Sequence, residues 1–233
     1  MSDRIFVIGD VHGCSKTFTT LLDDVCKINK SDAVYLLGDY IDRGPGSKGV
    51  VDKILEMQSS GYDVKAIRGN HEEMLLGALR STDMFLAWQH NGCEATLKSF
   101  GVKGPKALDQ KYIDFFEHLP YYYLLDDYII VHGGLNFNID DPLEDTYSMV
   151  WERNKELEPG KIGGRKMIVG HTPVPLQDVR SSLDSGKIML DGGCVYHGRY
   201  YGIGYLCALE LNSMELLYQE NIEDEKIYRG LSK

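Results

Sequence analysis

The amino-acid sequence predicts an α/β fold. Strand-like and helix-like hydrophobic patterns alternate through the first third of the 233 residues, helical patterns dominate residues 72–119, and strand-like patterns return afterwards. Such alternation is typical of parallel strands joined by right-handed helical crossovers. We therefore expect a single domain over residues 1–233, with a helical insertion at about residues 72–119.

The first third contains three expected strands and two expected helices. Strand patterns cover residues 4–9, 33–38 and 62–68, and helical patterns cover residues 16–28 and 47–57. Ser47 stands at the start of the second helix, where a serine caps free backbone N–H groups. Together these elements make a βαβαβ unit with a parallel sheet.

The expected insertion and the rest of the chain differ in their hydrophobic periodicity. Helical patterns cover residues 73–80, 84–100 and 112–119. Strand patterns then follow at residues 121–125, 128–132, 167–170, 187–190, 205–210 and 215–218. This periodicity supports the α/β class, but by itself it does not establish how the strands are divided into sheets.

Composition excludes several classes of function. The chain has 25 Lys and Arg against 35 Asp and Glu, a formal charge of −10. A nucleic-acid binder needs a basic face, and an anionic membrane attracts basic segments, so we expect neither partner. No apolar run approaches the ~18 residues of a membrane span. The N-terminus has Asp3 and Arg4 before a short strand-like run, so we expect no signal peptide. The five cysteines are widely spaced without a Cys-x-x-Cys pair, so we expect a reducing, cytoplasmic location.

Polar residues beside glycine cluster where five of the expected strands end. The segments are Gly9-Asp10-Val11-His12-Gly13, Gly38-Asp39-Tyr40-Ile41-Asp42-Arg43-Gly44, Arg68-Gly69-Asn70-His71-Glu72, His132-Gly133-Gly134 and Gly170-His171-Thr172-Pro173. Ligands of open α/β sheets bind outside the carboxyl ends of the strands. One shared site is therefore expected.

The chemistry of these residues favours divalent metal ions. Asp10 and His12 are two residues apart at a strand end, so both side chains leave on one side. Asp39 has two carboxylate oxygens and can bridge two cations. Oxygen and imidazole ligands from Asn70, His132 and His171 complete a set that suits Mn²⁺, Fe²⁺ or Zn²⁺. We expect two ions, with manganese as the first candidate, roughly 3.5–4 Å apart as in two-metal hydrolases.

These motifs resemble the phosphoprotein phosphatase family of the calcineurin-like metallophosphoesterases. The bacterial and phage branch, which includes lambda phosphatase-like and diadenosine tetraphosphatase-like proteins, is the most similar in its Asp191-Gly192-Gly193-Cys194 segment and in Arg68 directly before Gly69. The resemblance covers most of the chain. It implies a two-sheet β-sandwich flanked by helices and a dinuclear metal site.

The resemblance also implies a role for each motif residue. Asp10 and His12 are implied ligands of the first metal, Asp39 of both, and Asn70, His132 and His171 of the second. His71 is the implied general acid and Asp42 its carboxylate partner. The implied phosphate-binding residues are Arg43, Arg68 and Arg153. A metal-bridging hydroxide would attack phosphorus directly, with His71 protonating the leaving oxygen.

Two departures from the family pattern bear on the site. Thr172 and Pro173 follow His171, so the second histidine of the Gly-His-x-His pattern is absent and the first metal has fewer protein ligands. His197-Gly198 stands where bacterial relatives often have two glycines, which leaves the role of His197 in the substrate-facing wall open.

The sequence leaves three functions to be weighed. The leading prediction is a metal-dependent phosphomonoesterase, a serine/threonine protein phosphatase or one of dual specificity, acting on a phosphorylated protein or a small phosphoester. The first alternative is a hydrolase of diadenosine tetraphosphate or another nucleotide phosphoanhydride. A non-catalytic phosphate-binding interaction protein is disfavoured because His71 and Asp42 accompany the full ligand set. A monomer is compatible with the sequence, which leaves the oligomeric state open.

Overall fold

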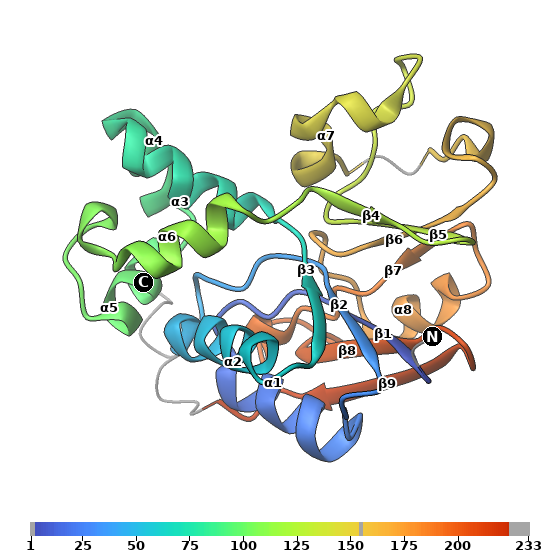
Figure 1. Cartoon of the computed structure of the whole chain (residues 1–233), viewed down its shortest axis with the longest axis horizontal. Helices are drawn as coiled ribbons and strands as arrows, with labels where there is room; N and C mark the ends of the chain where they lie inside the picture. The colour runs from blue at the N-terminus through green and yellow to red at the C-terminus, as the bar shows by residue number, and fades with distance from the viewer. Residues whose placement is uncertain (1–2, 154–155, 224–233) are drawn as a thin grey trace.

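The structure contains two β-sheets that pack face to face (Figure 1). It is a computed structural model, and it describes residues 3–153 and 156–223. The larger sheet has the strand order β3-β2-β1-β8-β9. Its strands are β1 (Ile5–Ile8), β2 (Ala33–Leu36), β3 (Asp63–Ala66), β8 (Tyr205–Glu210) and β9 (Glu215–Glu220). Strands β1, β2 and β3 are parallel, and β8 runs antiparallel to both β1 and β9.

The smaller sheet has the order β4-β5-β6-β7. Its strands are β4 (Tyr122–Leu124), β5 (Tyr128–Val131), β6 (Lys166–Val169) and β7 (Lys187–Met189). Strands β5, β6 and β7 are parallel, and β4 pairs antiparallel with β5. Several strands end one or two residues before the sequence pattern predicts, because the chain turns there into the loops that carry the polar motifs.

Alternating side chains along β1 and β8 explain the layered architecture. Val7 of β1 and Cys207 of β8 pack with Ile130 and Ile168 of the smaller sheet, in a core between the two sheets. Their neighbour Phe6 faces the opposite way, toward the helices. A strand places successive side chains on opposite faces, so each of these strands contributes to two cores. The α/β sandwich flanked by helices that the resemblance implied is confirmed.

Helices cover the outer faces of both sheets (Figure 1). Two of them, α1 (Ser15–Thr20) and α2 (Ser47–Ser59), pack on the larger sheet, and α7 (Thr146–Trp151) packs on the smaller one. The helix predicted at residues 16–28 is present but ends at Val25, and its second half is not α-helical. There a π-helical turn, η1 (Leu21–Val25), forms because the Cys26 N–H donates to the carbonyl of Leu21. The other helices after β5 are α8 (Leu176–Ser182), η3 (Pro142–Glu144), η4 (Pro159–Ile162) and η5 (Cys194–Tyr196).

The chain between β3 and β4 forms a group of helices beside the sandwich (Figure 1). These are α3 (Asn70–Arg80), α4 (Thr82–Gln89), α5 (Cys93–Phe100), η2 (Pro105–Ala107) and α6 (Gln110–Glu117). The single helix expected at residues 84–100 is wrong. The helix is interrupted at Gly92, whose φ of 97° favours glycine and whose carbonyl accepts the Arg43 N–H at 3.2 Å. Among the described residues, no helix has the length and apolar character to cross a membrane.

Candidate active site

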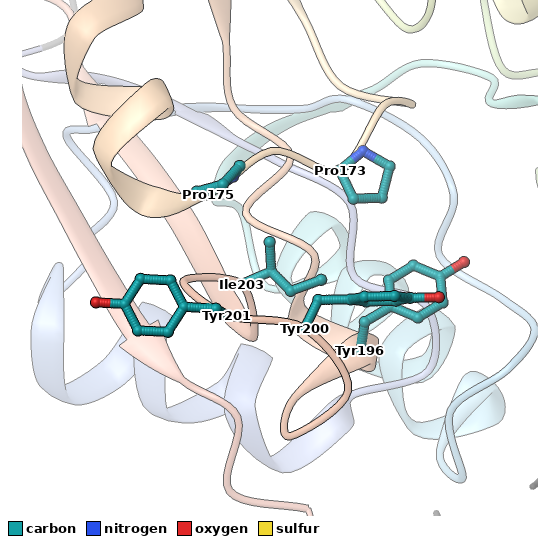
Figure 2. A pocket seen from close by; sticks show the side chains of 6 residues that line it. All are labelled: Pro173, Pro175, Tyr196, Tyr200, Tyr201 and Ile203. Atoms are coloured by element: carbon teal, nitrogen blue, oxygen red, sulfur yellow. The ribbon is translucent and has the colours of Figure 1, made fainter.

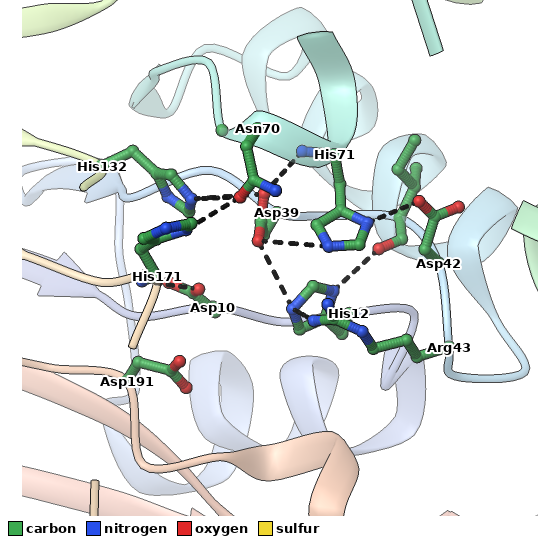
Figure 3. Close-up of polar contacts among 12 residues, drawn as sticks. Asp10, His12, Asp39, Asp42, Arg43, Asn70, His71, His132, His171 and Asp191 are labelled. Carbon is green, nitrogen blue, oxygen red and sulfur yellow. Dashed lines mark hydrogen bonds and ion pairs between the residues drawn. The ribbon is translucent and has the colours of Figure 1, made fainter. Parts of the chain in front are cut away.

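Loops from five strand ends bring the predicted site residues together (Figure 3). The loop after β1 carries Asp10 and His12, the loop after β2 carries Asp39 and Asp42, and the start of α3 carries Asn70 and His71. Strands β5 and β6 lead into His132 and His171. All eight side chains are buried. The sheets therefore assemble residues that lie up to 161 positions apart, as between Asp10 and His171.

Asp39 lies at the centre of the cluster. Its Oδ2 is 3.4 Å from Nε2 of His12, and its Oδ1 is 3.4 Å from Nε2 of His132. Two groups of potential metal ligands share this carboxylate. The first group is His12, Asp39 and His71, and the second is Asp39, His132 and His171. One carboxylate shared by two ligand groups is the arrangement that a bridging ligand requires.

Hydrogen bonds on the far side of each imidazole show which nitrogen faces the cluster. Nδ1 of His12 lies 3.0 Å from the carbonyl of Ile41, and Nδ1 of His132 lies 2.7 Å from the carbonyl of Leu37. A carbonyl only accepts, so each Nδ1 carries the proton and each Nε2 presents its lone pair toward Asp39. This is the tautomer that a metal-binding histidine needs.

Electron-rich atoms face one another around Asn70. Its Oδ1 is 3.0 Å from Nε2 of His132 and 2.9 Å from Nδ1 of His171. Burial lowers the pKa of His132 and lowers that of His171 to about 3, so both imidazoles are neutral near pH 7. Because Nδ1 of His132 donates to the Leu37 carbonyl, its Nε2 and the Oδ1 of Asn70 meet as two lone pairs, which suit a bound cation.

Several buried polar atoms have no protein partner, and this also fits a metal site. Asp10 Oδ1, His71 Nε2 and His171 Nε2 are buried without a hydrogen bond. Burial, with the charges of Asp191 and Asp39, raises the pKa of Asp10 above its usual range. An unpaired buried polar atom destabilises a fold by roughly 1–3 kcal/mol. Cations bound by Asp10 and His171 would remove that cost for these two residues.

The backbone at the site adopts conformations that most side chains avoid. Positive φ angles occur at His12 (45°), Asp39 (52°), Asp42 (73°), Arg43 (68°) and His171 (68°). Each such residue costs of order 1 kcal/mol and is usually retained where function requires the geometry. Glycine also allows close approach, because a Cβ on Gly170 would collide with Oδ1 of Asp10.

His71 and Asp42 form a buried pair at the edge of the cluster (Figure 3). Nδ1 of His71 is 2.6 Å from Oδ2 of Asp42, and Nε2 of His71 is 3.9 Å from Oδ2 of Asp39. The backbone N–H of His71 donates to Oδ1 of Asp39 at 3.0 Å. His71 is therefore held by its backbone N–H and by its ring Nδ1, and its Nε2 faces the metal ligands.

Glu72 is a site residue to which the sequence motif assigned no role. Its buried carboxylate accepts the backbone N–H groups of Asp39 (2.8 Å), Tyr40 (2.8 Å) and Gly69 (3.0 Å). Burial and the nearby Asp39 raise the pKa of Glu72 to about 8. Glu72 joins the loop after β2, which carries Asp39, to the loop after β3, which leads into Asn70. Its position in the Gly69-Asn70-His71-Glu72 segment is the sequence feature from which this role could have been predicted.

Other contacts had no sequence signal, because they come from distant helices. Trp88 of α4 donates its Nε1–H to Oδ2 of Asp42 at 2.6 Å, and Thr96 of α5 donates its hydroxyl to Oδ1 at 2.5 Å. Asp191, after β7, lies beside Asp10 and keeps a buried Oδ2 without a hydrogen-bond partner (Figure 3).

The three predicted phosphate-binding arginines differ in where they lie. Arg43 is at the site, with Nη1 2.5 Å from Nε2 of His12. Arg153 is exposed, and its charge contributes to the lowered pKa of both His132 and His171, so it lies within electrostatic reach of them.

Arg68 points into the scaffold, which corrects the role expected from its place before Gly69. It donates to Glu73 Oε2 and the Tyr121 hydroxyl, both at 3.0 Å, and to the carbonyls of Phe116 and Glu117. None of these partners belongs to the candidate metal ligands. The guanidinium joins the start of α3 to the end of α6.

We predict that Arg68→Ala lowers the free energy of unfolding, by about 1–3 kcal/mol, because it removes a partly buried hydrogen-bond centre. Denaturant unfolding checks this. The matched variant Arg43→Ala should instead raise KM for a phosphate ester, by roughly ten-fold, with little loss of stability. A raised KM in Arg68→Ala with unchanged stability would restore Arg68 to the phosphate site.

A tyrosine-lined pocket of about 370 Å³ opens beside the site (Figure 2). It is lined by Pro173, Pro175, Tyr196, Tyr200, Tyr201 and Ile203. The guanidinium carbons of Arg43 and Arg199 lie 5.5 and 6.0 Å from the centre of the Tyr196 ring. His197 is half-buried, and its Nδ1 lies 3.6 Å from Glu220.

Comparison with known proteins gives relatives over most of the chain. "Serine/threonine-protein phosphatase 1" of Salmonella typhimurium is 26% identical over 206 residues, which cover 84% of this chain and 89% of that protein. The asymmetrical bis(5'-nucleosyl)-tetraphosphatase PrpE of Bacillus mycoides is 24% identical, over 85% and 89%. The symmetrical bis(5'-nucleosyl)-tetraphosphatase of Nitrosomonas europaea is 28% identical over 58% of this chain, but the match spans about half (47%) of its own length.

Solved structures share the fold. A putative diadenosine tetraphosphatase superposes with a TM-score of 0.61 at 17% identity, covering 96% of this chain and 97% of the other. A Saccharomyces cerevisiae protein serine/threonine phosphatase also gives 0.61, at 19% identity and over 95% and 81%.

The family described as "Calcineurin-like phosphoesterase" matches residues 3–214. This match includes every predicted site residue, and it confirms the family resemblance of the sequence motifs. The Asp and His side chains that surround Asp39 are placed for a metal site. The chain belongs to the calcineurin-like phosphoesterases, and it is a metal-dependent enzyme that hydrolyses phosphate esters.

Proposed function

We propose that this enzyme hydrolyses phosphomonoesters with His71 as general acid, and that its substrates are proteins phosphorylated on serine or threonine, with tyrosine as a further candidate. The observation that carries the reaction is the 2.6 Å contact between His71 and Asp42 beside the shared Asp39 carboxylate. The alignment with the Salmonella phosphatase over most of both chains supports the substrate class.

The proposed metal ligands divide into two sets around Asp39. Asp10, His12 and Asp39 would hold one divalent ion, and the second set would be Asp39, Asn70, His132 and His171. We propose manganese, with iron or zinc as alternatives, because carboxylate, amide and imidazole ligands suit these ions. When bound, such ions lower the pKa of water and polarise phosphoryl oxygens.

The remaining residues bind and protonate the substrate in this proposal. Arg43 and Arg153 pair with phosphoryl oxygens, since a planar guanidinium matches them with two parallel hydrogen bonds. The general acid is the doubly protonated imidazolium of His71: its Nδ1–H donates to Asp42, and its Nε2–H is the proton that it can transfer. His71 then gives its proton to the leaving oxygen, so that the product leaves as a neutral alcohol and not as an alkoxide.

A second candidate is hydrolysis of a phosphoanhydride in a dinucleotide such as diadenosine tetraphosphate. The tyrosine-lined pocket favours it, because nucleobases stack on aromatic side chains. The guanidinium groups of Arg43 and Arg199, both near the Tyr196 ring, would meet the negative charge of a polyphosphate chain. The alignment with the Bacillus protein is equally extensive.

A substrate panel tests both candidates. The full chain, loaded with Mn²⁺, is assayed on 4-nitrophenyl phosphate, phosphoserine, phosphothreonine and phosphotyrosine peptides and diadenosine tetraphosphate, with Asp39→Ala as background. A kcat/KM highest on the serine and threonine phosphopeptides is expected. A ranking led by the dinucleotide, and lowered by Tyr200→Ala, would favour the second candidate. No turnover above background on any substrate would contradict both.

We also propose a cytoplasmic location. All five cysteines are buried, and they are widely spaced without a Cys-x-x-Cys pair, as expected of a protein that folds in a reducing compartment.

A further inference from the structure

We propose that the helical segment between β3 and β4 contributes to catalysis, because Trp88 of α4 and Thr96 of α5 position the Asp42 carboxylate and, through it, the ring of His71. The expected effect on turnover rests on the proposed function, in which His71 is the general acid; the positioning of Asp42 does not. Both are positioning residues, since neither touches the reacting atoms. The motifs at the strand ends contain neither residue.

The carboxylate of Asp42 is held from three directions. Oδ2 accepts from Nδ1 of His71 and from Nε1 of Trp88, each at 2.6 Å, and Oδ1 accepts from the hydroxyl of Thr96 at 2.5 Å. The side chains of Trp88, Thr96 and Asp42 are fully buried. Water is therefore not available to replace a lost donor, and each protein donor has a large effect on the orientation of the carboxylate.

Thr96 also fixes the backbone of Asp42. Its hydroxyl oxygen accepts the Asp42 N–H at 2.8 Å and lies 3.2 Å from the hydroxyl of Ser47. Asp42 has a φ of 73°, which a residue with a side chain adopts only when its surroundings impose it. The Thr96 hydroxyl thus contacts both the strained backbone of Asp42 and the Asp42 carboxylate.

The break between α4 and α5 places these two donors. Gly92 separates the helices, and its carbonyl accepts the N–H of Arg43, the residue after Asp42. A Cβ on Gly92 would come within 3.0 Å of the Arg43 backbone nitrogen. The interruption therefore fits the helical segment against the loop that carries Asp42, with Trp88 before the break and Thr96 after it.

Conservative variants separate positioning from mere packing. Thr96→Val keeps the shape of the side chain and removes the hydroxyl, Thr96→Ser keeps the hydroxyl, and Trp88→Phe removes the N–H donor. Thr82→Val, at an exposed position of α4, controls for a threonine-to-valine change in a helix. All variants are made in the full chain, and their melting temperature and metal content are measured first.

The kinetic test compares two leaving groups. Thr96→Val and Trp88→Phe should lower kcat on an alkyl phosphate by roughly 10–100-fold, because the proton donor is misplaced. The loss on 4-nitrophenyl phosphate should be much smaller, since that leaving group needs little protonation. KM and metal content should stay unchanged, and Thr96→Ser should recover most of the loss. Equal losses on both substrates, or none, would overturn the proposed catalytic effect.

Proton NMR of the metal-free protein tests the positioning independently of turnover. The His71 Nδ1–H, bonded to a buried carboxylate, should give a low-field signal in the parent and in Thr96→Ser. The signal should shift or broaden in Thr96→Val. An unchanged signal would overturn the positioning role. A changed signal without the leaving-group difference would support positioning and instead contradict His71 as the general acid.

Discussion

Asp39→Ala is expected to abolish binding of both metal ions and to reduce hydrolysis to the background rate. Asp39 is the one residue common to both potential ligand groups among the described residues, and its two oxygens lie 3.4 Å from His12 and His132. Removing it leaves each proposed ion with fewer ligands and no bridge. Elemental analysis after gel filtration in Mn²⁺ gives the stoichiometry directly.

The control for this variant is Asp23→Ala, which removes a carboxylate that is largely exposed in η1, where it pairs with Lys53. Asp23→Ala should bind metal as the parent does. Asp39→Ala should keep its fold, because Glu72 still holds the loop backbone at this position, and the variant loses one backbone hydrogen bond, from the His71 N–H to Oδ1. A folded Asp39→Ala protein that still binds two ions per chain would show that the bridging assignment is wrong.

His71→Asn is expected to lower kcat by roughly 10²–10⁴-fold while metal content and KM change little. The loss should be larger for an alkyl phosphate than for 4-nitrophenyl phosphate, because only the alkyl leaving group depends strongly on a proton donor. Steady-state kinetics on the two substrates check this prediction. Asparagine removes the imidazole acid and retains a polar side chain at the start of α3.

The metal content of His71→Asn separates two roles for this histidine. Nitrogen atoms of His71 and His12 lie close enough to Asp39 for all three residues to bind one ion. However, the 2.6 Å contact between Nδ1 of His71 and Asp42 favours the general acid. Loss of one ion per chain, with equal losses of kcat on both substrates, would make His71 a ligand instead.

The sequence predicted well those site residues that lie directly after a strand. Residues such as Asp10, Asp39 and His132 directly follow hydrophobic strand patterns, and the carboxyl ends of the parallel strands β1, β2, β5 and β6 face one region. Local periodicity and residue chemistry are enough to predict such a cluster. They also predicted the strands of the described residues, with bounds that differ by at most two residues. Of the α-helices only α2 and α6 match as closely, and α7 and α8 were not predicted.

The errors arose where long-range contacts decide the local structure. Arg68 is beside the motif in sequence, but the carbonyls at the end of α6 bind its guanidinium, 48 and 49 residues away. The helix break at Gly92 depends on the approach of the Arg43 backbone. Trp88 and Thr96 contact Asp42 from 46 and 54 residues away, so no short motif contains them. Each of these contacts requires the folded chain.

Two divalent ions that share the Asp39 carboxylate are central to the proposed mechanism, and anomalous X-ray diffraction from crystals grown with Mn²⁺ tests for them most directly. We expect two anomalous peaks per chain, each within coordination distance of a different oxygen of Asp39. One peak should also contact Asp10 and His12, and the other should contact Asn70, His132 and His171. A single peak, or two peaks of which one has no contact with Asp39, would contradict the shared carboxylate.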